Sequence, residues 1–339
     1  MLVHTFELCA QVSSEDCKAC GDFFFSQAHN QPACCYRQKE THQITFNGWN
    51  QNGIVVYLRE SKTNHSFGYI HLRITPEKVL GCSNPIALFH ANEPDVAELS
   101  DRLSVLFDGS PLLDIQFYLY RIDLCQDHIV ENGNIVAEYI RLLKKGASDQ
   151  WQIVNFGNEQ DKHSCRRVNT RYQVTAYDKL YQLDNRNIQF EWFSKQRILR
   201  VEVALLSMGI CHMSNKFHLS NDTWGMQLVH LAQYGGKIVS TIFDSLIPPG
   251  DYYSLAAAKK MIEQSLYSRP KREKIYHFLK EINRKSMVNP CTIRCHINWK
   301  KRLRQLAALN INPATIRSRA GIKHLPSLYP NQKTYSTGS

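Results

Sequence analysis

The 339-residue chain contains no uninterrupted apolar run near the roughly 18 residues that a membrane-spanning helix needs. Its first residues, MLVHTFELCAQ, lack the basic-then-apolar layout of a signal peptide. These two absences predict a non-secreted, cytoplasmic protein with no membrane partner. The composition, with 43% hydrophobic and 11% aromatic residues, is typical of a globular chain. The length allows one large domain or two of ordinary size.

The cysteine spacing is incomplete for a zinc site. Five of the eleven cysteines fall in the first 35 residues: Cys9, Cys17, Cys20, Cys34 and Cys35. Four thiolates can complete a tetrahedral zinc shell. However, no second CxxC follows the CKAC pair, and adjacent cysteines chelate one ion awkwardly. We expect free thiols in this segment, with a structural zinc ion as the alternative.

Acidic residues are scarce at the C-terminal end of the chain. The net charge is +11, but residues 1–268 carry 25 basic and 28 acidic side chains, whereas residues 269–339 carry 16 basic and two acidic ones. Basic side chains neutralise nucleic-acid phosphates and release counterions. The imbalance therefore predicts that the C-terminal part binds nucleic acid. An acidic membrane surface fits less well, because this part lacks a continuous apolar face.

Hydrophobic periodicity predicts an α+β fold followed by a helical region. Alternating β-rich runs cover residues 44–60, 66–75, 115–125, 151–157, 171–179 and 197–206, and helical spacing covers 95–107 and 132–146. The strands would be joined by hairpins and crossovers. From about residue 222 onward the pattern is helical, interrupted by Pro-Pro-Gly at 248–250.

Four of the predicted strands interrupt an apolar sequence with a polar pair two residues apart. Residues two apart share one face of a strand. A single pair of this kind is typical of a solvated face with a cross-strand salt bridge. Four pairs predict that neighbouring strands present His, Asp and Glu beside a tyrosine and several cations. The pairs are His71 with Arg73, Arg121 with Asp123, Tyr177 with Lys179, and Arg200 with Glu202.

This set of side chains suits phosphate chemistry. Carboxylates and imidazole can hold a divalent cation such as Mg²⁺ or Mn²⁺, and cationic groups absorb the charge on phosphoryl oxygens. A phenol has a pKa of about 10 and is a weak nucleophile at neutral pH unless its anion is stabilised. Lys179 and a nearby metal would supply that stabilisation, so Tyr177 is the candidate nucleophile.

Five segments in order resemble one known family, the gene II replication initiators of filamentous phages, which are related to plasmid rolling-circle initiators. The match extends from about residue 65 to about residue 320, and the first 40 residues have no counterpart. The segments are ITPEKVLGCSN (74–84), YRIDLC (120–125), VTAYDKLYQL (174–183), ILRVEVAL (198–205) and IRCHINWKKRLRQLAALNINPATI (293–316).

The resemblance implies a metal-dependent endonuclease and strand transferase for rolling-circle replication. Such an enzyme nicks one strand of double-stranded origin DNA, becomes linked through tyrosine to the 5′ phosphate, and later rejoins the displaced strand. The resemblance implies Tyr177 as the nucleophile, Asp123 and Glu202 as metal ligands, and His71 as the third ligand. Tyr181 is the alternative nucleophile. The two-histidine metal motif of many rolling-circle nickases is absent among the 14 histidines.

Seven cationic side chains are the expected contacts to phosphate or DNA. Four belong to a segment that resembles the second helix of a helix-turn unit, with apolar Leu303, Leu306 and Leu309 facing inward. The seven are Arg73, Arg121, Arg200, Lys300, Lys301, Arg302 and Arg304.

We expect four regions: a Cys-rich segment (1–42), a catalytic nicking domain (43–220), a basic helical DNA-binding domain (221–323) and a flexible tail (324–339). By resemblance, the catalytic domain would hold a mainly antiparallel sheet like that of rolling-circle nickases. The resemblance also implies origin duplex and single-stranded DNA as partners, host helicase and polymerase as further partners, and the host bacterial cytoplasm as the location. The alternative is a non-catalytic origin or promoter binder.

Overall fold

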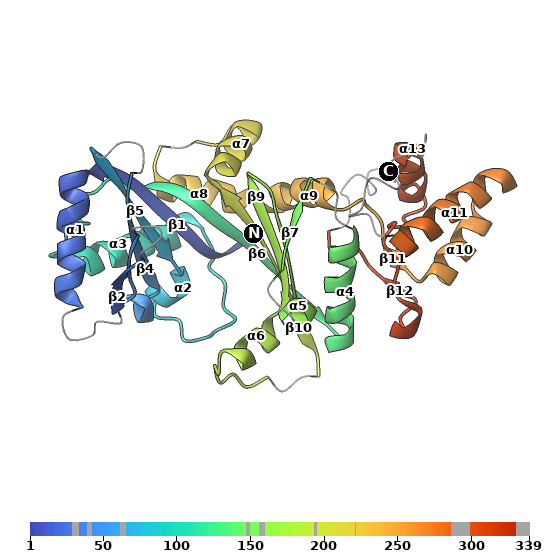
Figure 1. Cartoon of the computed structure of the whole chain (residues 1–339), viewed down its shortest axis with the longest axis horizontal. Helices are drawn as coiled ribbons and strands as arrows, with labels where there is room; N and C mark the ends of the chain where they lie inside the picture. Colours follow the sequence, from blue (N-terminus) through green and yellow to red (C-terminus); the bar gives the residue numbers. More distant parts are fainter. Residues whose placement is uncertain are drawn as a thin grey trace. The chain divides into compact units, whose positions relative to one another are not determined.

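The structure is a computed structural model that describes residues 1–28, 34–38, 43–61, 66–146, 150–155, 160–192, 195–220, 222–285 and 299–329. Its elements form an α+β fold, as the sequence predicted (Figure 1). Among the described residues, no helix is both long and apolar enough to cross a membrane.

Ten strands of the described chain form one antiparallel sheet in the order β2-β3-β4-β5-β1-β6-β10-β9-β8-β7. A separate pair, β11 (Tyr252–Tyr253) and β12 (His324–Leu325), is also antiparallel. The ten strands are β1 (Leu2–Ser13), β2 (Cys35–Arg37), β3 (Ile44–Phe46), β4 (Ile54–Glu60), β5 (Phe67–Ile74), β6 (Tyr118–Val130), β7 (Gln152–Val154), β8 (Ser164–Val168), β9 (Tyr172–Asp178) and β10 (Arg197–Leu206).

The contacts divide the chain into two units, and their boundary falls inside β6 and β10. Unit 1 comprises Met1–Gln126, Thr170–Tyr172 and Glu202–Gly236. Unit 2 comprises Asp127–Asn169, Gln173–Val201 and Lys237–Ser339. The boundaries expected from sequence, at residues 42 and 220, do not coincide with these units, because two long strands contribute to both.

Helices of unit 1 cover the apolar face of its strands. Helix α1 contacts β1, β4 and β5, and α8 contacts β1 and α3. An aromatic cluster joins α1, β3 and α3 through Phe24, Phe46, Trp49 and Phe107, with neighbouring ring centroids 4.6–5.9 Å apart. The helices of this unit are α1 (Ser14–Gln27), η2 (Asn50–Asn52), α2 (Pro76–Val79), α3 (Glu93–Phe107), α7 (Ser207–Phe217) and α8 (Trp224–Gln233).

The N-terminal residues, which the sequence set apart as a Cys-rich segment, supply a central strand. β1 pairs with β5 on one side and β6 on the other. It ends at Ser13, whose hydroxyl accepts a hydrogen bond from the Asp16 backbone N–H at 3.0 Å. This N-cap starts α1 directly after the strand.

In unit 2, α10, α11 and α13 share one hydrophobic core. Its buried members include Ala258, Ile275 and Leu306, and Leu303 and Leu309 pack against it, which confirms the inward face predicted for this segment. The other helices of unit 2 are either shorter than these three or come before them in the chain. The helices of unit 2 are α4 (Gly133–Gly146), α5 (Gln160–His163), α6 (Lys179–Asn185), α9 (Gly235–Leu246, most of it in this unit), α10 (Leu255–Gln264), α11 (Arg269–Lys285), α13 (Trp299–Ala307) and η3 (Ser318–Ala320).

Gly250 allows two distant segments of unit 2 to meet. Its φ is +118°, and a Cβ atom there would lie 2.7 Å from the backbone N of Asn312. The Asp251 N–H donates to Asn310 and the Asn312 N–H donates to Asp251. The Pro-Pro-Gly break therefore ends α9 and also lets the chain pair with the residues after α13.

One local prediction is wrong, and another falls mostly outside the described residues. Of the tail expected to be flexible from residue 324, His324–Leu325 form β12, and residues 330–339 lie outside the described part. The strand predicted over 171–179 ends at Asp178, because that side chain accepts a hydrogen bond from the Tyr181 N–H at 3.1 Å and caps α6. Lys179 is therefore the first residue of α6 and does not share a strand face with Tyr177.

Candidate functional site

One face of the unit 1 sheet carries a row of charged side chains. Glu7 of β1 lies opposite Arg73 of β5 and Arg121 of β6. The neighbouring residue Leu8 is buried on the other face, opposite Leu72. This alternation places titratable groups on one face of β5 and β6, as the sequence predicted, with β1 between them.

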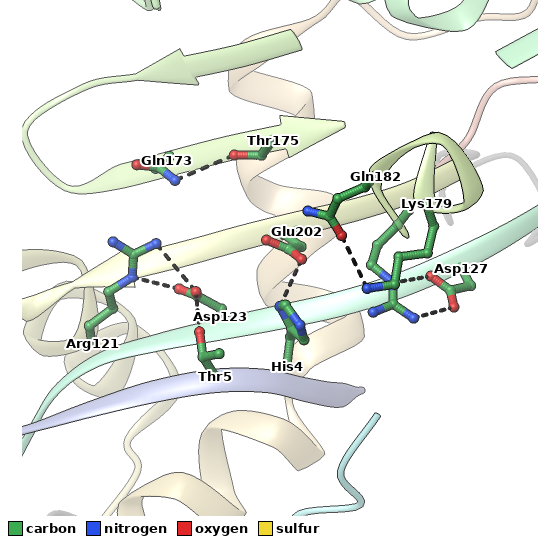
Figure 2. Close-up of polar contacts among 11 residues, drawn as sticks. His4, Thr5, Arg121, Asp123, Asp127, Gln173, Thr175, Lys179, Gln182 and Glu202 are labelled. Carbon is green, nitrogen blue, oxygen red and sulfur yellow. Dashed lines mark hydrogen bonds and ion pairs between the residues drawn. The ribbon is translucent and has the colours of Figure 1, made fainter. Parts of the chain in front are cut away.

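Asp123 lies beyond this row on β6 and is 2% exposed (Figure 2). Arg121 donates to it from Nε to Oδ1 at 2.7 Å and from Nη2 to Oδ2 at 3.3 Å. The Thr5 hydroxyl donates to Oδ2 at 2.6 Å. A register shift between Val3 and Phe6 puts two β1 residues opposite Asp123, so this bulge presents Thr5 to the carboxylate.

Glu202 of β10 pairs with a histidine that the sequence reasoning missed. The Nδ1 of His4 lies 2.8 Å from Oε1 of Glu202, and both side chains are partly exposed (Figure 2). His4 belongs to the same bulge as Thr5. The two predicted acidic residues thus each contact a side chain of β1.

Arg121 interacts electrostatically with the carboxylates of Asp123, Glu7 and Glu202. Burial lowers the pKa of Arg121, but the charges of Asp123, Glu7 and Glu202 outweigh it and raise that pKa above its ordinary value. Burial raises the pKa of Glu7, although Arg121 and Arg73 oppose the shift. Arg121 therefore compensates an acidic group of three carboxylates in unit 1.

As arranged, these residues do not fit a divalent cation. Among the described residues, no three His, Cys, Asp or Glu side chains lie close enough to hold one ion. Both oxygens of Asp123 already accept hydrogen bonds from Arg121 and Thr5. A cation that used Asp123 would have to displace the guanidinium.

His71, the predicted third ligand, lies in a different part of this face. It pairs with Cys9, which is four residues from Thr5 on β1, or about 13 Å along a strand. Its Nε2 lies 3.7 Å from the Cys9 Sγ, and its ring lies edge-on to Tyr120 at 4.8 Å. Burial, followed by the charge of Arg59, lowers the pKa of His71 to about 4. The structure does not bring His71 to Asp123.

Tyr177 is the second-last residue of β9 in unit 2 and is 6% exposed. It pairs with Ser164 of β8. Its neighbours on both faces of β9, Thr175, Ala176 and Asp178, are also buried. The side chain is therefore positioned by a strand that is buried on both sides.

The two residues predicted around Tyr177 lie on α6. Lys179 is 4% exposed, and its Nζ donates to Oε1 of Gln182 at 3.1 Å (Figure 2). Tyr181 is more exposed than Tyr177, and its ring stacks on His163 at a centroid distance of 3.6 Å. The alternative nucleophile thus has an imidazole against its ring.

The strand arginines differ in their surroundings. Arg200 has no exposed surface and binds Asp127 in a bidentate pair, with Nε to Oδ1 at 2.7 Å and Nη2 to Oδ2 at 2.8 Å. Arg121 is held by Asp123 as described above. Arg73 is exposed. Of these three predicted phosphate contacts, Arg73 is the one whose side chain faces solvent.

The predicted cations of the C-terminal segment lie on α13. Lys300, Lys301 and Arg304 are exposed, and Arg302 donates to Oε1 of Gln305 at 2.7 Å. The first residues of the quoted segment, 293–298, lie outside the described part. The three exposed cations Lys300, Lys301 and Arg304 lie away from Leu306 and the core, whereas half-buried Arg302, four residues before Leu306, lies on its side of the helix.

None of the described cysteines of the N-terminal segment forms a disulfide bond. Cys17 and Cys20 are buried on α1, and burial, followed by the charges of Cys17 and Asp16, raises the pKa of Cys20 to about 12. The Cys20 thiol is therefore protonated at neutral pH in this arrangement.

Comparison of the chain with models of known protein families and with curated proteins found no match. The likeness to phage replication initiators therefore depends on the five sequence segments alone.

His4, Thr5 and Glu7 are the site residues that sequence reasoning missed. The stretch VHTFELCA is rich in β-forming residues and contains three titratable side chains, His4, Glu7 and Cys9, which was a usable signal. The bulge interrupts the alternation of apolar and polar residues in this stretch, so the sequence does not show the regular pattern of a half-buried strand.

Proposed function

We propose that the chain is a replication initiator that nicks one DNA strand through a tyrosine-linked intermediate and later rejoins it. The observation that supports this function best is the placement of three of the five family-like segments. YRIDLC lies on β6, ILRVEVAL on β10 and VTAYD on β9, and these are consecutive strands of the sheet. Segments that are far apart in the chain thus lie on neighbouring strands of one sheet.

The proposed reaction is a phosphoryl transfer to tyrosine. The Tyr177 phenol loses its proton to a base or to solvent, and its oxygen attacks the scissile phosphorus. The P–O3′ bond breaks, the 3′ oxygen takes up a proton, and the 5′ phosphate remains attached to Tyr177. Attack by a 3′ hydroxyl on this phosphotyrosine reverses the step and rejoins the strand. The energy of the broken bond is kept, so no external energy source is needed.

The test is the formation of a covalent adduct. The full chain is incubated with Mg²⁺ or Mn²⁺ and origin-containing DNA, either supercoiled or single-stranded, and then denatured. We expect nicked DNA and a protein-DNA adduct that Tyr177→Phe abolishes and Tyr181→Phe retains. Phenylalanine keeps the buried ring of Tyr177, so loss of the adduct would report the missing hydroxyl. An adduct that persists in Tyr177→Phe and disappears in Tyr181→Phe would move the nucleophile to α6.

A divalent cation would be held by Asp123 and Glu202 only after Arg121 and His4 release them. The same assay, repeated with a chelator, measures whether nicking needs that rearrangement. Asp123→Asn and Glu202→Gln then identify the carboxylate on which a cation requirement depends.

A non-catalytic origin or promoter binder is the second candidate function. Two observations favour it: the carboxylates of unit 1 are already paired, and Tyr177 is 6% exposed. A binder predicts sequence-selective DNA affinity with no adduct under any metal or DNA condition, and that result would replace the nicking function.

A further inference from the structure

The most exposed large apolar side chain of the described residues lies at the turn between α10 and α11. Leu266 has a relative exposure of 106%, compared with 74% for Val105, the next highest. Single exposed apolar residues are common on protein surfaces. What distinguishes Leu266 is how firmly its loop, residues 265–268, is held and which charges surround it.

Hydrogen bonds fix both ends of this loop. The Ser265 hydroxyl donates to the Ile262 carbonyl at 2.7 Å and closes α10. The Lys271 and Arg272 N–H groups donate to the Ser268 carbonyl at 2.9 and 3.0 Å and start α11. Some of the backbone groups that a helix end leaves unpaired are therefore satisfied at both helix ends adjoining Leu266.

Side chains add two further restraints. Tyr267 packs against the core shared by α10, α11 and α13, and the Lys271 Nζ lies 3.9 Å from its ring centroid. The Arg272 guanidinium donates to the Glu263 carbonyl and so bridges from α11 to α10. Leu266 is consequently held outward by a rigid support, because its neighbour Tyr267 is fixed inward.

The charge around the loop matches a polyanion. Residues 259–274 contain six basic and two acidic side chains. Both acidic side chains already pair within their helices, Glu263 with Lys259 at 3.6 Å and Glu273 with Arg269 at 3.1 Å. The outer surface of this helical hairpin therefore presents net positive charge on both sides of an apolar tip.

We propose that Leu266 is a wedge that enters between base pairs of duplex DNA while the surrounding cations hold the phosphates. Proteins that unstack DNA insert an apolar side chain at one base step and compensate the cost with backbone contacts. This inference rests on the proposed function, because locally separated bases would give a nicking enzyme access to one strand of the duplex. It assigns that separation to the α10–α11 hairpin.

The experiment uses the full chain and a 30-base-pair A·T-rich duplex that contains 2-aminopurine, whose fluorescence rises when it is unstacked. Binding is followed on the same duplex by anisotropy. We expect the wild-type chain to raise the fluorescence at saturation. Leu266→Ala should lose most of that rise while its Kd changes by less than about threefold, since affinity depends mainly on phosphate contacts. Val105→Ala, which shortens the next most exposed apolar side chain, is the matched control and should retain the rise.

A second variant distinguishes the contribution of Leu266 from that of the surrounding cations. Arg269→Gln should weaken binding and its salt dependence, yet leave the fluorescence at saturation unchanged. An equal rise in Leu266→Ala and wild type would overturn the wedge, and so would duplex binding without any rise or a failure to bind the duplex. Leu266-dependent binding to vesicles of anionic phospholipid, with no unstacking of DNA, would assign the tip to a membrane surface and also overturn it.

Failure of the wedge and failure of nicking are distinguishable. Single-stranded DNA needs no unstacking, so Leu266→Ala should form the covalent adduct on it as well as wild type. Unstacking without any adduct would retain the wedge and remove the nicking function. An adduct on single-stranded DNA without unstacking of the duplex would retain the nicking function and overturn the wedge.

Discussion

In unit 1 the carboxylates of Asp123 and Glu202 on the sheet face are buried or partly buried and each contacts another side chain, whereas on α10, α11 and α13 most cations face solvent. Asp123 is enclosed by Arg121 and Thr5, and Glu202 contacts His4. Lys300, Lys301 and Arg304, by contrast, are exposed. Both regions carry many charges, but their physical roles differ.

The charges of the two regions have different roles: buried pairs hold side chains in place, whereas exposed cations attract a polyanion. A paired, buried charge holds its partners in one geometry, because removing either partner leaves the other uncompensated in a low dielectric. An exposed cation adds little to stability but contributes to the affinity for a polyanion, and salt screens that contribution. Substitutions in the first region should change stability, and those in the second should change DNA binding.

The largest effect on stability is expected at Glu138 of unit 2. This residue is an example of a buried, paired charge outside the sheet face of unit 1. Glu138 is fully buried and accepts hydrogen bonds from Arg141 at 2.6 Å and from Arg317 at 2.9 Å. Glu138→Gln should lower the free energy of unfolding at pH 7 by about 3–5 kcal/mol, since two guanidinium groups lose their counter-charge. Urea unfolding of both proteins measures the difference.

The pH dependence of this difference tests its electrostatic origin. Burial raises the pKa of Glu138, but the hydrogen bonds and charges of Arg141 and Arg317 outweigh burial and hold that pKa below its ordinary value of 4.5. The stabilisation is therefore complete above pH 4.5 and is lost as the pH falls through the lowered pKa. The two proteins should converge in acid. A difference that stays constant from pH 7 to pH 3 would contradict the charge explanation.

The second-largest effect on stability is expected at Thr5, where removing one hydroxyl removes one hydrogen bond to Asp123. Thr5→Val removes the hydroxyl that donates to Asp123 at 2.6 Å and keeps the side-chain shape. A hydrogen bond to a charged group contributes about 1.5–3 kcal/mol, so we expect a loss of that size in urea unfolding. Thr45→Val is the control, because buried Thr45 bonds the neutral amide of Gln43 and should lose only about 0.5–1.5 kcal/mol. Equal losses would show that the charge of Asp123 adds nothing.

Periodicity was enough to predict much of the fold. The β-rich run over 44–60 forms the antiparallel strands β3 and β4, and the helical spacing over 95–107 and 132–146 corresponds to α3 and α4. These elements bury one regular face, so their pattern survives in the sequence. The interleaving of two units through β6 and β10 depends on tertiary contacts that no local pattern records.

The candidate site was predictable in part. Asp123 and Glu202 were found because each follows an arginine at strand spacing, and Arg121 does bind Asp123. His4 and Thr5 were missed because a bulge breaks the alternation of β1. Lys179 was assigned to the wrong element because the capping role of Asp178 competes with strand propensity. Local turn chemistry and register, which periodicity does not capture, account for these errors.

For the exposed region, the expected change is in the salt dependence of DNA binding. Replacing Lys300, Lys301 and Arg304 with glutamine should reduce the slope of log K against log salt by about 2.7, since each phosphate contact contributes about 0.9. Anisotropy on an unrelated 30-base-pair duplex at several salt concentrations measures the slope. The control removes three cations from unit 1, Lys18, Lys78 and Arg102, which are also exposed. An equal reduction in the control would indicate an effect of net charge rather than of α13.

The smallest effect on stability, and the sharpest separation of the two regions, is expected at Glu273 of α11. Its carboxylate pairs with Arg269 at 3.1 Å, and both side chains are mostly exposed. Glu273→Gln should change the free energy of unfolding by less than about 0.5 kcal/mol, because exposed ion pairs contribute little. The same variant should bind duplex DNA more tightly at low salt, since Arg269 loses its competing partner. Urea unfolding and anisotropy measure the two effects, and weaker DNA binding would mean that this face of α11 does not contact phosphate.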